Sequence, residues 1–259
     1  MSDIENQEDE IEYVEPLSND HLILVNGPTG TGKSTSLMPL KNDTSLWYLN
    51  CESNKKLPFK AKFYQHNVSD PFEVYSAFES AKDNPEISTI VIDTLTFLME
   101  KFESQYVIGS ANGLSAWSDY AQFYKNLMQV HVAGAPQTVV ILAHTSSDLN
   151  ETEGVIETSV PVKGALKKIS IESFFSCIVS TKRMAVKDLK KYENPMLTIT
   201  EEDEDLGIKY VFQTRITKDT INERIRGPIG MWSVQETFID NNIQYLIDRL
   251  NEYYGDDDE

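Results

Sequence analysis

The stretch that decides the fold is HLILVNGPTGTGKS, residues His21–Ser34. Its apolar part, 21–26, is short, contains β-branched residues and ends at a glycine, which predicts a buried strand. A helix is expected at Ser34–Leu40, where Pro39 would kink or end it. A glycine-rich loop that joins a buried strand to the start of a helix is a setting in which proteins bind phosphate groups.

The loop fits G-x-x-x-x-G-K-[ST] at every fixed position. Glycines let backbone N–H groups approach an anion where a Cβ atom would clash. Lys33, also a candidate catalytic residue, would reach the β- and γ-phosphates, and the Ser34 hydroxyl would bind magnesium. The alternative is a glycine-rich turn with an incidental lysine. We predict a site for ATP with Mg²⁺ formed by Gly27, Pro28, Thr29, Gly30, Thr31, Gly32, Lys33, Ser34 and Thr35, the last at the α-phosphate.

A carboxylate ends the next strongly apolar segment, ISTIVID, at Asp93. Ligands of open parallel sheets gather at the carboxyl ends of strands, so Asp93 is expected to hold magnesium together with Ser34. The alternative is a helix N-cap, because a helix is predicted to follow at Thr94–Phe102.

Two further strand ends carry candidate catalytic groups. Many phosphate-loop ATPases place a glutamate directly after the metal-binding aspartate, but Thr94 occupies that position here. Glu52, after a strand at 45–51, would orient or deprotonate a water molecule if that strand neighbours the one ending at Asp93. His144, after a strand at 138–143, would donate a hydrogen bond to the γ-phosphate. The alternatives are a solvated loop glutamate and an ordinary hydrogen-bonded histidine.

Strands alternate with helices along most of the chain. This order predicts an α/β fold, with a mostly parallel sheet, helices on both faces and some antiparallel strands toward the C-terminal edge. A single domain is expected at 19–254, between a disordered acidic tail at 1–18 and a second acidic tail at 255–259. The remaining predictions are a strand at 61–65, helices at 71–81 (with Asp70 as N-cap) and 116–132, an irregular segment at 146–161, a helix at 164–173, a strand at 174–181, hairpin arms at 197–200 and 209–214, and a helix at 238–253.

The net charge of −18 first argues against a nucleic-acid partner, because phosphate neutralisation drives such binding. Seven acidic residues lie in 1–15, five in 201–205 and four in 256–259, which leaves 25 acids against 23 bases elsewhere. The charge therefore weakens the case for DNA binding without excluding it. The sequence contains no apolar run long enough to span a bilayer and no secretory signal, so no membrane partner is expected. Cys51 and Cys177 are expected to be buried free thiols.

In the order of its motifs the chain resembles the RecA-core ATPases, and more closely the phage-encoded Sak single-strand-annealing group. The resemblance covers roughly Leu22–Trp232 and rests on the phosphate loop, Glu52 within CESNKKLPF, IVID followed by threonine, ILAHT at His144, and RGPIGMW from Arg226. It implies a RecA-like core and a magnesium-dependent ATPase that acts on single-stranded DNA as a ring or filament. The implied location is the cytoplasm of a phage-infected bacterium.

The resemblance also implies roles for individual residues. Glu52 matches the catalytic glutamate, and His144 matches the γ-phosphate sensor. The segment 146–168 matches a DNA-binding loop, although it is acidic as far as Glu157. Its candidate DNA contacts are Lys163, Lys167 and Lys168, with solvated lysines as the alternative. The candidates for a cation that reaches a neighbouring subunit's ATP are Arg215 and Lys218, with Arg224 and Arg226 as rivals.

Three functional classes follow. The first is a DNA-dependent ATPase of recombination, annealing or replication, which self-associates and has a possible replication or recombination protein partner. The second is a nucleotide-switched adaptor, such as a helicase loader, to which the acidic segments are suited. A small-molecule kinase is the third, and it would need an arginine-rich lid, whereas 146–161 contains neither lysine nor arginine.

Overall fold

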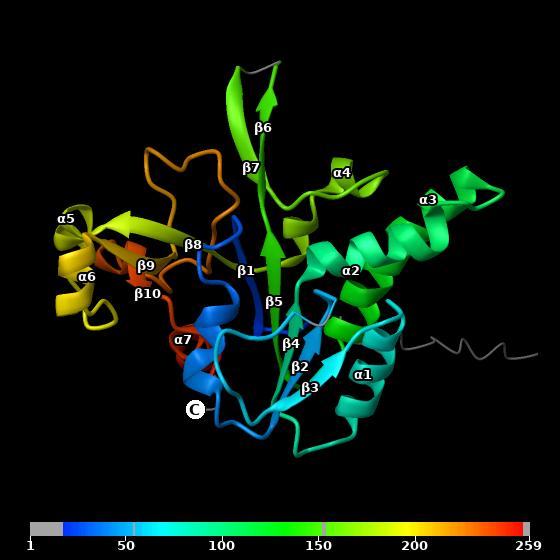
Figure 1. The fold of residues 1–259 in the computed structure, drawn as a ribbon, viewed down its shortest axis with the longest axis horizontal. Helices are drawn as coiled ribbons and strands as arrows, with labels where there is room; N and C mark the ends of the chain where they lie inside the picture. The colour runs from blue at the N-terminus through cyan, green and yellow to red at the C-terminus, as the bar shows by residue number, and fades with distance from the viewer. Residues whose placement is uncertain (1–17, 54, 152–153, 256–259) are drawn as a thin grey trace, which may run out of the picture.

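The computed structural model describes residues 18–53, 55–151 and 154–255, and their central element is a mixed eight-stranded sheet (Figure 1). Six neighbouring strands of this sheet (β3, β2, β4, β5, β1 and β8) run parallel, while β9 is antiparallel to both β8 and β10. The predicted α/β class, with antiparallel strands at the C-terminal edge, is confirmed. In spatial order the strands are β10 (Phe238–Asp240), β9 (Ile208–Gln213), β8 (Cys177–Ala185), β1 (Leu22–Gly27), β5 (Thr138–His144), β4 (Thr89–Asp93), β2 (Leu46–Asn50) and β3 (Tyr64–Asn67).

Helices cover both faces of the sheet, as predicted. One face packs against α1 (Glu73–Lys82), α2 (Leu95–Phe102) and α3 (Gly113–Asn126), and the last two continue as the π-helical turns η2 (Glu103–Val107) and η3 (Leu127–Val132). The other face packs against the 3₁₀ helix η1 (Ser34–Leu40) and α7 (Ile243–Tyr254).

The alternation of side chains along β1 explains why both faces are covered. Leu22 and Leu24 belong to the apolar cluster beneath α1, α2 and α3, whereas Ile23 and Val25 belong to the cluster beneath η1 and α7. Successive side chains of a strand point to opposite faces, so an unbroken apolar run requires cover on both sides.

The segment after His144 contradicts the predicted irregular structure. It forms a hairpin of β6 (Ser146–Asn150) and β7 (Val155–Ser159), which projects beyond the carboxyl end of β5 (Figure 1). Leu149 and Ile156, paired across the hairpin, are 64% and 62% exposed. Because no residue of β6 or β7 is buried in a core, these strands lack the apolar alternation by which strands are recognised.

The helix predicted at 164–173 is also wrong. The chain instead forms α4 (Leu166–Ile169) and the 3₁₀ turn η4 (Ile171–Phe174), separated by Ser170 with φ +61°. A non-glycine residue in the left-handed region interrupts a helix at that point. The following strand, β8, begins three residues later than predicted, at Cys177 rather than 174, and runs four residues further, to Ala185.

The predicted hairpin arm at 197–200 has no strand structure. Its place opposite β9 is taken by β8, and the connection contains α5 (Val186–Leu189), the 3₁₀ turn η5 (Lys190–Tyr192) and α6 (Glu201–Leu206). The acidic segment between the two predicted arms is therefore a short helix and not the turn of a hairpin. Thr200 and Asp203 form a reciprocal capping box, and Gly207 ends the helix with φ +70°.

Smaller corrections concern element ends. β3 begins three residues later and ends two residues later than the strand predicted at 61–65. α1 begins at Glu73 with Phe72 at the N-cap position, so Asp70 is not the N-cap, although its carboxylate accepts from the Phe72 N–H at 2.8 Å. The predicted helix at 238–253 begins only at Ile243, after η6 (Gln235–Thr237) and β10. The predicted tails lie almost wholly outside the described residues. Within the described part of the chain, no helix is long and apolar enough to cross a membrane.

Candidate phosphate-binding site

The glycine-rich loop lies between β1 and η1, as expected, and two of its glycines are sterically required. Gly27 and Gly32 have φ values of +154° and +97°. A Cβ atom on Gly27 would lie 2.2 Å from Thr181 Oγ1, and one on Gly32 would lie 2.5 Å from Asn241 Nδ2. The loop therefore packs against residues far along the chain, and larger side chains at these positions would push it away.

Lys33 lies inside the loop and is 5% exposed. Its Nζ donates to the carbonyl oxygens of Gly27 at 2.7 Å and Pro28 at 2.8 Å. Burial lowers the pKa of Lys33 to about 8, although Asp93 and Glu52 act in the opposite direction. A partly desolvated ammonium is a strong electrostatic partner for an anion that enters the loop.

Ser34 and Asp93 meet as predicted. The Ser34 hydroxyl donates to Asp93 Oδ2 at 2.7 Å, and the Tyr48 hydroxyl donates to the same oxygen at 2.7 Å. Burial raises the pKa of the Asp93 carboxyl, and the two hydrogen bonds oppose that shift. Asp93 does not cap α2, which begins at Leu95 with Thr94 at the N-cap position.

The other carboxylate oxygen, Asp93 Oδ1, is buried and has no hydrogen-bond partner among the described residues. A buried carboxylate oxygen without a partner is costly, and a cation satisfies it. Together with the Ser34 hydroxyl it forms a set of hard oxygen donors, which is the kind that magnesium prefers. The residues present therefore fit a Mg²⁺ ion.

Glu52 and His144 are brought together by the order of the sheet. β2 neighbours β4, as the proposed role of Glu52 required, and Asn50 lies opposite Asp93. His144 Nε2 lies 3.0 Å from Glu52 Oε1, and Lys55 forms an ion pair with Glu52 Oε2. The hydrogen bond with His144 is the main reason why the pKa of Glu52 falls to about 2, with a smaller contribution from Lys55.

His144 also faces the phosphate loop. Its Nδ1 lies 3.3 Å from Thr29 Oγ1, and its backbone N–H donates to Thr96 Oγ1 at 2.9 Å. A neutral imidazole that donates from Nε2 to a carboxylate leaves Nδ1 as an acceptor for the Thr29 hydroxyl. The histidine therefore connects Glu52 to the loop, and β6 begins two residues after it.

A cavity of about 190 Å³ lies between the loop and Glu52. The residues that form one side of it belong to the predicted phosphate-binding segment, from Thr29 to Thr35, and the other side is formed by Glu52, His144, Pro58 and two lysines. These lysines, Lys55 and Lys56, were not among the predicted site residues. They belong to the loop that follows Glu52, and only their position in CESNKKLPF could have indicated them.

Tyr48, Asn50, Thr181 and Asn241 also contribute to the site and were missed. Asn241 Nδ2 donates to the Gly32 carbonyl at 2.8 Å, and Thr181 Oγ1 lies 2.5 Å from Thr31 Oγ1. Neither residue belongs to a motif, and both lie more than 140 positions along the chain from their partners. Tyr48 carries a weak signal, since it lies on the same strand that leads to Glu52.

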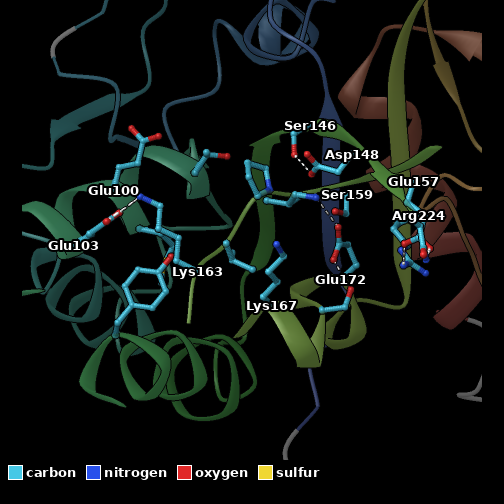
Figure 2. A pocket seen from close by; sticks show the side chains of 18 of the residues that line it. Glu100, Glu103, Ser146, Asp148, Glu157, Ser159, Lys163, Lys167, Glu172 and Arg224 are labelled. Atoms are coloured by element: carbon cyan, nitrogen blue, oxygen red, sulfur yellow. Dashed lines mark hydrogen bonds and ion pairs between the residues drawn. The ribbon is translucent and has the colours of Figure 1, made fainter. Parts of the chain in front are cut away.

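The predicted DNA-contacting lysines lie around a second, larger cavity of about 510 Å³ beside the hairpin (Figure 2). Lys163 and Lys167 line it, whereas Lys168 is exposed on α4. Lys163 and Lys167 do not share a helix face, because α4 begins only at Leu166. Lys163 Nζ instead binds both carboxylate oxygens of Glu103, at 2.8 and 2.7 Å.

The candidate trans-acting cations lie in the segment after β9. Arg215 is exposed but its Nη1 donates to the Trp232 carbonyl at 2.6 Å, and Lys218 is exposed. Arg224 pairs with Glu157 of the hairpin at 3.1 Å (Figure 2), and Arg226 donates to the Glu172 carbonyl at 2.5 Å. Arg215, Arg224 and Arg226 therefore all make hydrogen bonds or ion pairs within this chain.

The fold and the site together define an α/β protein with a mostly parallel sheet, a glycine-rich loop after β1, a strand-end carboxylate and a glutamate–histidine pair at one edge. No protein-family model matches this chain, and no curated protein matches it.

Proposed function

We propose that this protein is a magnesium-dependent ATPase with a RecA-like core. The observation that carries the proposal is the convergence of four predicted groups at one edge of the sheet. Ser34 bonds Asp93 at 2.7 Å, and Glu52 and His144 lie 3.0 Å apart across the adjoining cavity. Metal-binding, base and sensor groups at neighbouring strand ends are what in-line attack of water on a γ-phosphate requires.

Each group has a task that its position supports. The loop amides and Lys33 would bind the phosphates and hold the γ-phosphate toward Glu52. Ser34 and Asp93 would hold Mg²⁺, which supplies charge neutralisation on the β- and γ-phosphate oxygens. Glu52 would orient the attacking water and accept its proton, and His144 would hold Glu52 in place. Lys33→Ala is therefore expected to abolish magnesium-dependent ATP binding.

We further propose single-stranded DNA as the substrate that the ATPase acts on, in recombination, annealing or replication. The resemblance to the Sak group supports this, as does the hairpin that begins two residues after His144. Movement of His144 upon nucleotide binding would reposition β6 and β7 directly. The test is the rate of ATP hydrolysis with and without single-stranded DNA, and stimulation by DNA is the expected result.

One observation favours a nucleotide-switched adaptor instead. The hairpin carries Asp148 and Glu157, and Lys163 beside it is already paired with Glu103. An acidic hairpin repels a phosphate backbone, whereas its exposed Leu149 and Ile156 suit a protein surface. Hydrolysis that DNA leaves unchanged, but that a protein partner alters, would favour the adaptor. Self-association belongs to both proposals and is measured by sedimentation with and without ATP.

A further inference from the structure

The loop after β2 carries Lys55, which lines the smaller cavity, on a backbone held by hydrogen bonds. Asn50 Oδ1 accepts from the Glu52 N–H at 3.0 Å, and Asn50 Nδ2 donates to the Lys55 carbonyl at 3.0 Å. The Lys55 N–H closes the turn by donating to the Glu52 carbonyl at 3.1 Å. The backbone at both residues is therefore held, while the Lys55 side chain is 59% exposed and has room to reorient.

Both carboxylate oxygens of Glu52 have a partner in this arrangement. Oε1 faces His144 Nε2 and Oε2 is paired with the Lys55 ammonium, and the Glu52 side chain is 6% exposed. A carboxylate whose two oxygens both accept from donors is a weaker base, and each oxygen has less capacity left to accept from a water molecule. The low pKa of Glu52, about 2, agrees with this geometry.

Lys55 also lines the same cavity as Gly30, Lys33 and Ser34 of the phosphate loop. Its ammonium therefore has two competing anions within one small space, the Glu52 carboxylate and any phosphate group bound to the loop. Lysine binds phosphate as a mobile point charge, and a phosphate with several negatively charged oxygens attracts it more strongly than one carboxylate.

We propose that Lys55 is a positioning residue whose ammonium leaves Glu52 for the γ-phosphate when a triphosphate binds. The inference rests on the function proposed above. The released Oε2 then accepts a proton from water as the water oxygen bonds to the γ-phosphorus and the bond to the β-phosphate oxygen breaks. The products are ADP and inorganic phosphate, and the proton lies on Glu52. A diphosphate, which has no γ-phosphate, leaves the Lys55–Glu52 pair intact.

The experiment compares the affinities for a non-hydrolysable ATP analogue and for ADP, both with magnesium, by calorimetry. Lys55→Met removes the charge and keeps most of the aliphatic side chain. It is expected to weaken binding of the ATP analogue about tenfold, the effect of one charge-assisted hydrogen bond, while the affinity for ADP stays the same. Lys55→Arg is expected to bind the ATP analogue as tightly, relative to ADP, as the wild type does. Lys60 is an exposed lysine of the same loop that lies outside the cavity, and Lys60→Met is expected to leave both affinities unchanged.

A second measurement tests the competition between the two anions. Glu52→Gln removes the carboxylate that competes for Lys55, so affinity for the ATP analogue should rise several-fold, and the rise should shrink when Lys55→Met is also present. Equal effects of Lys55→Met on both nucleotides, or independent effects of the two substitutions, would overturn the inference and leave the proposed ATPase intact. Failure of the wild-type protein to bind either nucleotide would overturn both.

Discussion

Ser34 and Asp93, 59 residues apart in the sequence, share a hydrogen bond of 2.7 Å. The contact joins the end of the phosphate loop to the end of β4 and leaves Asp93 Oδ1 buried without a protein partner. The pair is therefore the place to test whether a metal ion belongs to the site.

Asp93→Asn keeps the size of the side chain and removes its charge. We expect the variant to lose most of the magnesium-dependent gain in ATP affinity, about tenfold or more, because a neutral amide binds Mg²⁺ weakly. The measurement is an ATP titration with magnesium and with EDTA. Asp119→Asn, an exposed aspartate on α3, is the control. An equal response to magnesium in both variants would remove Asp93 from the metal site.

Glu52→Gln separates binding from turnover. Amide and carboxylate have the same shape, so ATP should still bind, whereas hydrolysis should fall by a factor of about 10² or more, because a general base is lost. Single-turnover hydrolysis measures this. A variant that hydrolyses ATP at the normal rate would show that the base is another group.

The low pKa of Glu52 also predicts a pH dependence of stability. The group is ordinarily half-protonated near pH 4.5 and here near pH 2, mainly because of His144. Its contribution is fully present above about pH 4.5 and is lost as the pH falls toward 2. At neutral pH the unfolding free energy of the wild type should exceed that of Glu52→Gln by about 1–2 kcal/mol. This is less than the full pKa shift would give, because solvent screens the interaction with the exposed Lys55. Urea unfolding at several pH values should show the gap closing in acid.

Two loop glycines make a matched pair. Gly32→Ala and Gly30→Ala both place a Cβ at positive φ, but only at Gly32 would it meet another residue, Asn241, at 2.5 Å. We expect both to cost about 1 kcal/mol of backbone strain, and Gly32→Ala to cost a further 1–3 kcal/mol from overpacking. Thermal unfolding gives the comparison. Equal costs would mean that Asn241 moves aside freely.

The two lysines of the larger cavity should differ in their effect on DNA binding. Lys163 is engaged by Glu103, so its ammonium is partly neutralised before any DNA arrives. Lys167→Ala is therefore expected to weaken single-stranded DNA binding more than Lys163→Ala and to reduce the salt dependence by about one counterion. Binding titrations at several salt concentrations measure both quantities. The reverse order would mean that DNA breaks the Lys163–Glu103 pair.

Sequence alone was sufficient for the features that depend on local chemistry. The phosphate loop, the strands that end at Asp93 and His144, and the mixed sheet were all predictable, because an unbroken apolar run has to be buried on both faces. Where burial did not constrain the pattern, prediction failed. Neither β6 nor β7 has a buried residue, and the helix at 201–206 depends on the caps Thr200 and Gly207 rather than on an apolar face.

What the sequence determined by itself is which groups are candidates for the proposed chemistry: the loop glycines, Lys33, Ser34, and the polar residue at the end of each buried strand. Only the tertiary structure decided how those groups are paired. Whether Glu52 meets His144, Tyr48 meets Asp93 and Asn241 reaches Gly32 depends on the order of strands and on contacts between distant segments. No local pattern encodes such contacts, because they arise from the packing of the whole chain and not from the preferences of neighbouring residues.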